Sequence, residues 1–277
     1  MFVDLHLHST ASDGTLSPLK LADEARRHGL AAFALADHNT TAGLEEVRAG
    51  GLSEPDGPHL LAGVELDAWH AGQGWHVLGY GFDGRNEGLQ ALCRRNRENQ
   101  EDVNRRVVLG LEGQHSGLTA AYGQYTPKEP GGWKLLHFLR AQGLADTLHG
   151  GLRHYVLTGV AADESTFPPV AEAAAALHAA GGVALLAHPG ADIAASAGSP
   201  AFWAVLDDLL AQGLDGVECF HPSHSVALEA DLVTLCQRRG LLISGGSDCH
   251  GEFFAGTKQR VGGQFVPAEA VAALLAR

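Results

Sequence analysis

The chain has 277 residues, of which 45% are hydrophobic and 18% are charged, and its formal net charge is −13. This composition favours one large α/β domain or two small ones and argues against disorder. The negative charge disfavours a generally basic surface for long nucleic acid, but it is compatible with a locally basic pocket for a phosphorylated substrate.

Short apolar runs alternate with helical patterns, which predicts βα units and a parallel sheet. The predicted strands cover residues 2–7, 31–36, 59–66, 75–82, 182–187, 216–220 and 241–244. Helices are expected at about 17–29, 39–48, 168–180, 201–212 and 226–239. Ser17-Pro18 is typical of a helix start, and Gly29 of a helix end.

Residues 84–160 interrupt this alternation. A charged helical stretch covers 86–111, a loop-like segment covers 113–130, and a short helical pattern covers 133–142. We therefore expect residues 1–83 and 161–277 to form the main domain and residues 84–160 to form a helical insertion.

Histidines and acids gather where the predicted strands end. His6 and His8 are two residues apart in a strand, so their side chains point the same way, and Asp13 follows closely. The others at or just past a strand end are His38, Glu65, His188, Asp248 and His250, whereas His76 lies near the start of its strand. In a closed parallel barrel the strand ends share one face, so these side chains would converge. Their number exceeds what one ion needs, which favours two or three divalent metals.

Several segments resemble the PHP (polymerase and histidinol phosphatase) family of metal-dependent phosphoesterases. They are Asp4-Leu-His6-Leu-His8-Ser-Thr-Ala-Ser-Asp13-Gly, Ala36-Asp37-His38-Asn39-Thr, Gly63-Val-Glu65-Leu, His76-Val-Leu-Gly-Tyr, Ala187-His188-Pro189 and Gly246-Ser-Asp248-Cys-His250-Gly. The resemblance implies a distorted (β/α)7 TIM-like barrel with a trinuclear site. It implies that His6, His8, Glu65 and Asp248 hold one ion, that Asp13, His38 and His250 hold a second, and that Glu65, His76 and His188 hold a third.

The family uses manganese, zinc or iron, and an all-nitrogen-and-oxygen ligand set suits each of them. The chain is most similar to the branch that acts on nucleoside 3′,5′-bisphosphates or degrades short RNA from its 5′ end. Residues 112–160, with Gly131-Gly-Trp-Lys134, depart from that branch. Because an insertion there would help to shape the substrate pocket, the departure bears on the substrate more than on the chemistry.

Phosphate ester hydrolysis needs an activated water, neutralised phosphoryl oxygens and a protonated leaving alkoxide. We expect a metal-bridging hydroxide to attack phosphorus. His221, just past a strand end, is the candidate general acid. Asp37 is a candidate for orienting a ligand histidine.

Four cations are candidate substrate contacts. Arg94 and Arg97 lie in the charged helical stretch, where a solvated face paired with nearby acids is the alternative. Lys128 and Lys134 flank Gly131-Gly132. Any of them could bind a phosphate group.

The expected activity is hydrolysis of a small, nucleotide-like phosphomonoester. The alternatives are a phosphodiesterase or 5′-3′ exoribonuclease acting on short RNA, and a non-catalytic metal-binding regulatory module. A lysine-bridged amidohydrolase is disfavoured because none of the four lysines (Lys20, Lys128, Lys134 and Lys258) lies at a predicted strand end. The four cysteines form no C-x-x-C pair, and no signal or membrane segment is apparent, so we expect a cytoplasmic protein that binds neither membranes nor long nucleic acid.

Overall fold

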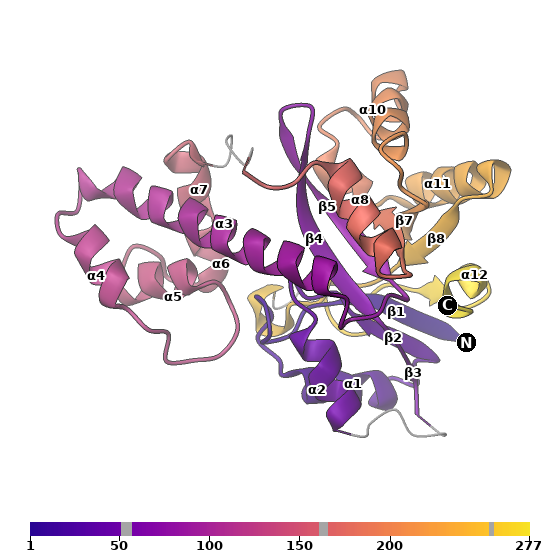
Figure 1. The fold of residues 1–277 in the computed structure, drawn as a ribbon, viewed down its shortest axis with the longest axis horizontal. Coiled ribbons are helices and arrows are strands. Elements are labelled where there is room, and N and C mark those ends of the chain that lie inside the picture. Colours follow the sequence, from indigo (N-terminus) through magenta and orange to yellow (C-terminus); the bar gives the residue numbers. More distant parts are fainter. Residues whose placement is uncertain (51–56, 161–165, 255–257) are drawn as a thin grey trace.

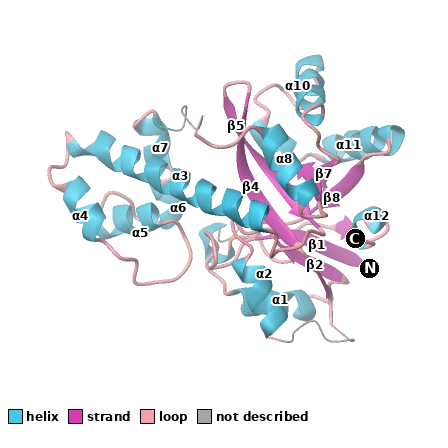
Figure 2. Cartoon of the chain, viewed as in Figure 1, coloured by secondary structure: helices cyan, strands magenta, loops and turns pink. Residues whose placement is uncertain are grey.

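A computed structural model describes residues 1–50, 57–160, 166–254 and 258–277. Two β-sheets lie at the centre of the main body, and helices flank them (Figures 1 and 2). No helix in the described part of the chain is long and apolar enough to cross a membrane.

The first sheet has the strand order β3-β2-β1-β9. Its strands are β1 (Phe2–Leu7), β2 (Ala32–Leu35), β3 (His59–Leu61) and β9 (Val266–Pro267). The first three strands run parallel, as predicted, and β9 pairs antiparallel with β1. Sequence patterning missed β9 because it has only two residues.

The second sheet has the strand order β4-β5-β6-β7-β8. Its strands are β4 (Gly63–His70), β5 (Gln73–Tyr80), β6 (Val183–Leu186), β7 (Gly216–Phe220) and β8 (Leu242–Gly245). Strands β6 to β8 are parallel, whereas β5 runs antiparallel to both of its neighbours. The β4–β5 turn contains Ala71 and Gly72 at φ +50° and +86°, a combination typical of tight hairpins.

Two predictions about these strands were wrong. The single strand expected at 59–66 is two strands, β3 and β4, which belong to different sheets. The expected purely parallel arrangement is mixed, because the Ala71-Gly72 turn joins β4 and β5 as a hairpin instead of a helical crossover.

The mixed α/β class is as predicted, but the two sheets do not close into one barrel among the described strands. Isolated parallel bridges join Leu7 to Cys249 and His38 to Glu65, where the sheets approach each other. The main hydrophobic cluster extends across both sheets and includes Leu5, Val64 and Leu185, each fully buried. The sheets therefore share one core although their hydrogen bonding is discontinuous.

Helices of the main body follow the strands. They are α1 (Pro18–Arg27), α2 (Ala42–Ala49), α8 (Val170–Ala179), α9 (Pro189–Asp192), α10 (Pro200–Leu210), α11 (Val226–Arg239), α12 (Ala272–Leu275) and the 3-10 helix η2 (Gly251–Phe254). Ser17 accepts a hydrogen bond from the Lys20 amide and Pro18 is the first helical residue of α1, as its sequence predicts.

The remaining helices form the region that interrupts the alternation. They are α3 (Glu87–Glu112), α4 (Leu118–Gln124), α5 (Lys134–Ala141), α6 (Leu148–Gly151) and α7 (Arg153–Leu157). Helix α4 lies in the stretch that was expected to be a loop. Figure 1 shows α4 to α7 grouped beside the far half of α3, away from the sheets. The expected domain boundary at residue 161 falls outside the described residues.

Candidate metal centre

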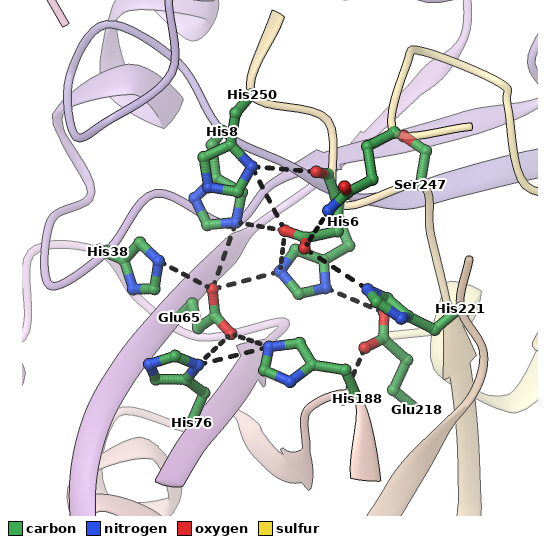
Figure 3. A network of polar contacts seen from close by, with 12 residues as sticks. His6, His8, His38, Glu65, His76, His188, Glu218, His221, Ser247 and His250 are labelled. Carbon is green, nitrogen blue, oxygen red and sulfur yellow. Dashed lines mark hydrogen bonds and ion pairs between the residues drawn. The ribbon is translucent and has the colours of Figure 1, made fainter. Parts of the chain in front are cut away.

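Glu65 lies at the centre of a cluster of histidines (Figure 3). Its side chain is 1% exposed. Oxygen Oε2 lies 3.2 Å from Nε2 of His6, 3.2 Å from Nε2 of His8 and 3.4 Å from Nε2 of His38. Oxygen Oε1 lies 3.1 Å from Nε2 of His188 and 3.5 Å from Nδ1 of His76. One buried carboxylate therefore faces five imidazoles.

Two more carboxylates complete the predicted set. Asp248 Oδ1 lies 3.5 Å from Nε2 of His6 and 3.3 Å from Nε2 of His8. Asp13 Oδ2 lies 3.2 Å from Nε2 of His250, and Asp13 Oδ1 lies 3.5 Å from Nδ1 of His8. All nine residues expected to bind metal thus lie in one connected cluster.

Strand direction explains why His76 belongs to this cluster. It lies early in β5, but β5 is antiparallel to β6, so its early residues lie beside the end of β6. The amide of Ala187, just past β6, donates a hydrogen bond to the carbonyl of His76. His76 and His188 are consequently neighbours, with Nδ1 and Nε2 3.3 Å apart.

The backbone is unusual at three of the strand ends. Asn39, His188 and Asp248 have φ angles of +53°, +20° and +52°. Positive φ is uncommon for residues other than glycine and is often found at functional sites. Here these conformations occur in or next to residues of the cluster.

Three carboxylates that the sequence analysis did not single out contact the outer nitrogens of the histidines. Glu218 Oε1 lies 2.9 Å from Nδ1 of His6, and Glu218 Oε2 accepts the His188 amide at 2.8 Å. Asp192 lies 3.1 Å from Nδ1 of His188. Asp67 Oδ1 lies 3.2 Å from Nδ1 of His38 and 3.4 Å from Nε2 of His76.

Their positions in the sequence carried a weak signal. Asp67 is two residues after Glu65 in a strand and therefore on the same face, and Asp192 is four residues after His188, one helical turn on. Such outer carboxylates fix which ring nitrogen carries the proton and direct the other nitrogen toward an ion.

The protonation equilibria reflect the density of opposite charges. Burial alone would lower the pKa of His38, but Glu65, Asp13 and Asp67 raise it to about 10. Burial likewise opposes protonation of His250, whose pKa Asp13 and Asp248 raise to about 9. Burial would raise the pKa of Glu65, yet His38, His6 and His76 hold it well below its usual range. Carboxylates packed this densely favour positive charge at the imidazoles, and a bound divalent metal ion would compete with protons for the same ring nitrogens.

The donor set fits divalent metal ions. Both ring nitrogens of His8 are buried and make no hydrogen bond in the described structure. The separations of 3.1–3.5 Å around Glu65 and Asp248 are close to the roughly 3.3 Å between tetrahedral ligands with bonds of about 2.0–2.1 Å. Groups of donors compatible with one ion are His8, Asp13, His38 and His250; His6, His8 and Asp248; and His6, Glu65 and His188.

His221 lies beside this cluster and is 4% exposed. Its Nε2 is 3.4 Å from Oδ2 of Asp248, and its Nδ1 is 2.7 Å from the hydroxyl of Ser223. Asp37 is 1% exposed and accepts hydrogen bonds from the amide of Ser9 and the hydroxyls of Ser9 and Ser12. Asp37 thereby fastens the loop between His8 and Asp13.

A cavity of about 560 Å³ opens over the cluster. It is lined by Glu65 and His188 of the cluster, by His221, and by Trp133, Leu152, Phe253 and Lys258. The cavity is not lined by any of the four cations predicted to contact the substrate, Arg94, Arg97, Lys128 and Lys134. Among the described residues, Lys258 is the one basic lysine or arginine side chain that lines it. Arg97 donates to the carbonyl of Asn39, and Lys134 lies 4.3 Å from the ring centre of Tyr122.

Comparison with known proteins shows a shared family. The PHP domain matches residues 4–119. Phosphoribosyl 1,2-cyclic phosphate 1,2-diphosphodiesterase from Eggerthella lenta is 30% identical, with 91% of this chain and 95% of that protein covered. A 5′-3′ exoribonuclease from Haemophilus influenzae is 32% identical, with 67% and 68% covered. The 3′,5′-nucleoside bisphosphate phosphatase of Chromobacterium violaceum is 29% identical, with 90% and 87% covered.

A solved structure shares the overall fold. It is a protein from Bifidobacterium adolescentis assigned as a metal-dependent phosphoesterase, with a TM-score of 0.76 and 30% sequence identity. The match covers 99% of this chain and 95% of that one, so it extends through the region of α3 to α7.

Proposed function

The chain belongs to the PHP family of metal-dependent phosphoesterases, and we propose that its substrate is a small, nucleotide-like phosphomonoester. It is an enzyme that hydrolyses phosphoric esters. The observation that carries the proposal is the cluster of six histidines and three acids centred on Glu65, seven of which line one cavity of about 560 Å³. A cavity of that volume suits a small molecule.

Two or three divalent ions, manganese, zinc or iron, would be held by the nine predicted ligands. His6, His8, Glu65 and Asp248 would hold one. Asp13, His38 and His250 would hold another, and Glu65, His76 and His188 a third. When bound, such ions supply Lewis acidity and activate water for attack on phosphorus.

The chain's own residues would complete the reaction. Asp67, Asp192 and Glu218 orient His38, His188 and His6, respectively. His221 lines the cavity and contacts the hydroxyl of Ser223 through Nδ1, and it would donate a proton to the departing alkoxide through Nε2.

Hydrolysis of phosphodiesters is the second candidate. The names of the Eggerthella and Haemophilus relatives, a cyclic phosphate diphosphodiesterase and an exoribonuclease, favour it. The same metal ligands would serve either reaction, so the distinction must come from the walls of the cavity.

A substrate panel tests both candidates. Manganese-loaded protein is assayed with adenosine 3′,5′-bisphosphate, AMP, histidinol phosphate, a five-membered cyclic phosphate and a short 5′-phosphorylated RNA. We expect release of inorganic phosphate from a monoester. Shortening of RNA or opening of the cyclic phosphate without monoester hydrolysis would favour the second candidate. No hydrolysis of any ester with metals bound would contradict both and favour a non-catalytic module.

A further inference from the structure

The segment Gly131–Trp133 is the part of the insertion that reaches the first loop of the main body. Gly131 has φ +71°, and a side chain there would collide with the carbonyl oxygen of Gly14, next to Asp13. The carbonyl of Gly131 contacts Nε2 of His137 at 2.6 Å, and His137 is only 3% exposed. The backbones of Gly131 and Gly14 therefore lie close together, and His137 of helix α5 holds the segment on its other side.

This contact places the indole of Trp133 at the metal cluster. Its ring centre lies 5.8 Å from that of His38, with the planes tilted by 48°. Trp133 is half-buried and lines both the main cavity and an adjoining one of about 280 Å³. The indole N–H has no hydrogen-bond partner among the described residues. A large flat surface and a polar donor are thus presented to whatever occupies the cavity.

The two parts of the cavity differ in depth and chemistry. Glu65 and His188 are nearly inaccessible, whereas Trp133, Leu152 and Phe253 are partly exposed. A phosphoryl group bound at the metal cluster would leave the rest of the substrate against these apolar side chains. Phe253 lines the same cavity, and its ring centre lies 6.0 Å from that of His250.

We propose that Trp133 is a specificity-determining residue that stacks on a planar ring in the leaving group of the substrate. The proposal rests on the proposed function and narrows it to phosphate esters of ring-bearing alcohols. Stacking on an aromatic side chain tolerates any base, because every base has a π-face. The insertion, to which Trp133 belongs, thereby supplies substrate selection.

The test compares two esters of secondary alcohols, adenosine 3′-phosphate with a ring and glycerol 2-phosphate without one. For Trp133→Ala we expect kcat/KM on the adenosine ester to fall about tenfold to a hundredfold, mainly through KM, as loss of one stacked base predicts. The glycerol ester should change less than twofold. Trp133→Phe should recover most of the loss, and Trp203→Phe, on α10, is the matched control that should change neither ester.

Several results would overturn the proposal. An equal fall on both esters would show that Trp133 only supports the fold, and no change on either would show that it does not contact substrate. If Trp133→Ala fails to fold, Trp133→Leu and Trp133→Phe decide, because only Phe retains a stacking face.

Hydrolysis of neither ester by the wild type would count against the proposed function instead. Equilibrium dialysis of adenosine 3′-phosphate against the wild type and Trp133→Leu then tests the stacking on its own. Equal affinities would overturn it, and at least fivefold weaker binding by the variant would support it.

Discussion

At the residue scale, four of the nine predicted metal ligands stand in local patterns that the sequence itself makes visible. His6 and His8 share a face of one strand, and Asp248 and His250 flank one turn. The outer acids Asp67 and Asp192 were not found, because an acid near a histidine in sequence is common and only the fold shows which nitrogen it contacts.

Glu218 is the outer acid with the clearest testable role. Both of its oxygens face donors, His6 Nδ1 and the His188 amide, at 2.9 and 2.8 Å. Glu218→Gln places an NH₂ group against one of them. We expect metal affinity to fall about tenfold to a hundredfold, as for other outer partners of metal ligands. Competition with a chelator measures it, and Glu172→Gln, on the surface of α8, is the control. Unchanged affinity would contradict the role.

The contribution of His221 to the rate of hydrolysis is expected to increase with the basicity of the leaving group. His221→Asn should slow glycerol 2-phosphate by about 10²–10⁴-fold, because an alkoxide needs a proton as it departs. p-Nitrophenyl phosphate, whose leaving group is stable without one, should slow less than tenfold. Steady-state rates of both esters check this, with His178→Asn as a distant control. Equal slowing of the two esters would exclude His221 as the acid.

At the scale of elements, most helices and the positions of most strands could be predicted, but the direction of individual strands could not. Apolar patterning gives the period of a strand and says nothing of its partner, so residues 59–66 were read as one element and β5 as parallel. The apparent exception of His76 was in fact the signal of an antiparallel β5. Helix α4 was missed because it is short, because Gly113 and Gly117 precede it and because Gly123 lies within it.

His224 joins two of these elements and should make stability pH-dependent. Nδ1 contacts the carbonyl of Cys219 at the end of β7, and Nε2 accepts the amide of Gly190 in α9, so the imidazole must be neutral. Burial, the largest cause, lowers its pKa from 6.5 to about 4. The unfolded chain therefore binds this proton first, and stability is lost as pH falls from about 6.5 toward 4.

The contribution of His224 to the pH dependence is the difference between the wild type and a variant that lacks this imidazole. Urea unfolding at pH 7.5 and pH 4.5 should show a larger loss for the wild type than for His224→Gln, by up to about 3 kcal/mol. His115→Gln, which replaces an exposed histidine, should behave as the wild type does. Parallel losses in wild type and His224→Gln would refute the assignment.

At the scale of the whole molecule, the described residues contain a hydrophobic cluster confined to the insertion. It includes Val107, Leu135, Phe138 and Leu139, all fully buried, and is separate from the main cluster. We propose from this that residues 84–160 form a distinct unit, although the first part of α3 packs on the sheets through Leu89 and Leu92.

Leu139→Ala tests that proposal. Removing a buried leucine costs about 2–5 kcal/mol, and the loss should appear where the side chain packs. We expect native-state hydrogen exchange to quicken in α4 to α7 while β1 and β6 stay protected. Leu185→Ala, in the main cluster, should quicken exchange throughout. Uniform quickening in Leu139→Ala would mean that the insertion and the sheets open as one unit.

The positive φ angles of Asn39, His188 and Asp248 have a consequence for the evolution of this protein. Each such residue costs about 1–3 kcal/mol, and glycine would relieve much of that cost. Glycine would also remove a predicted metal ligand at His188 or Asp248, and at Asn39 the side chain next to the predicted ligand His38. Selection for heat resistance alone should therefore enrich glycine at these three positions and yield variants that outlast the parent but no longer turn over substrate.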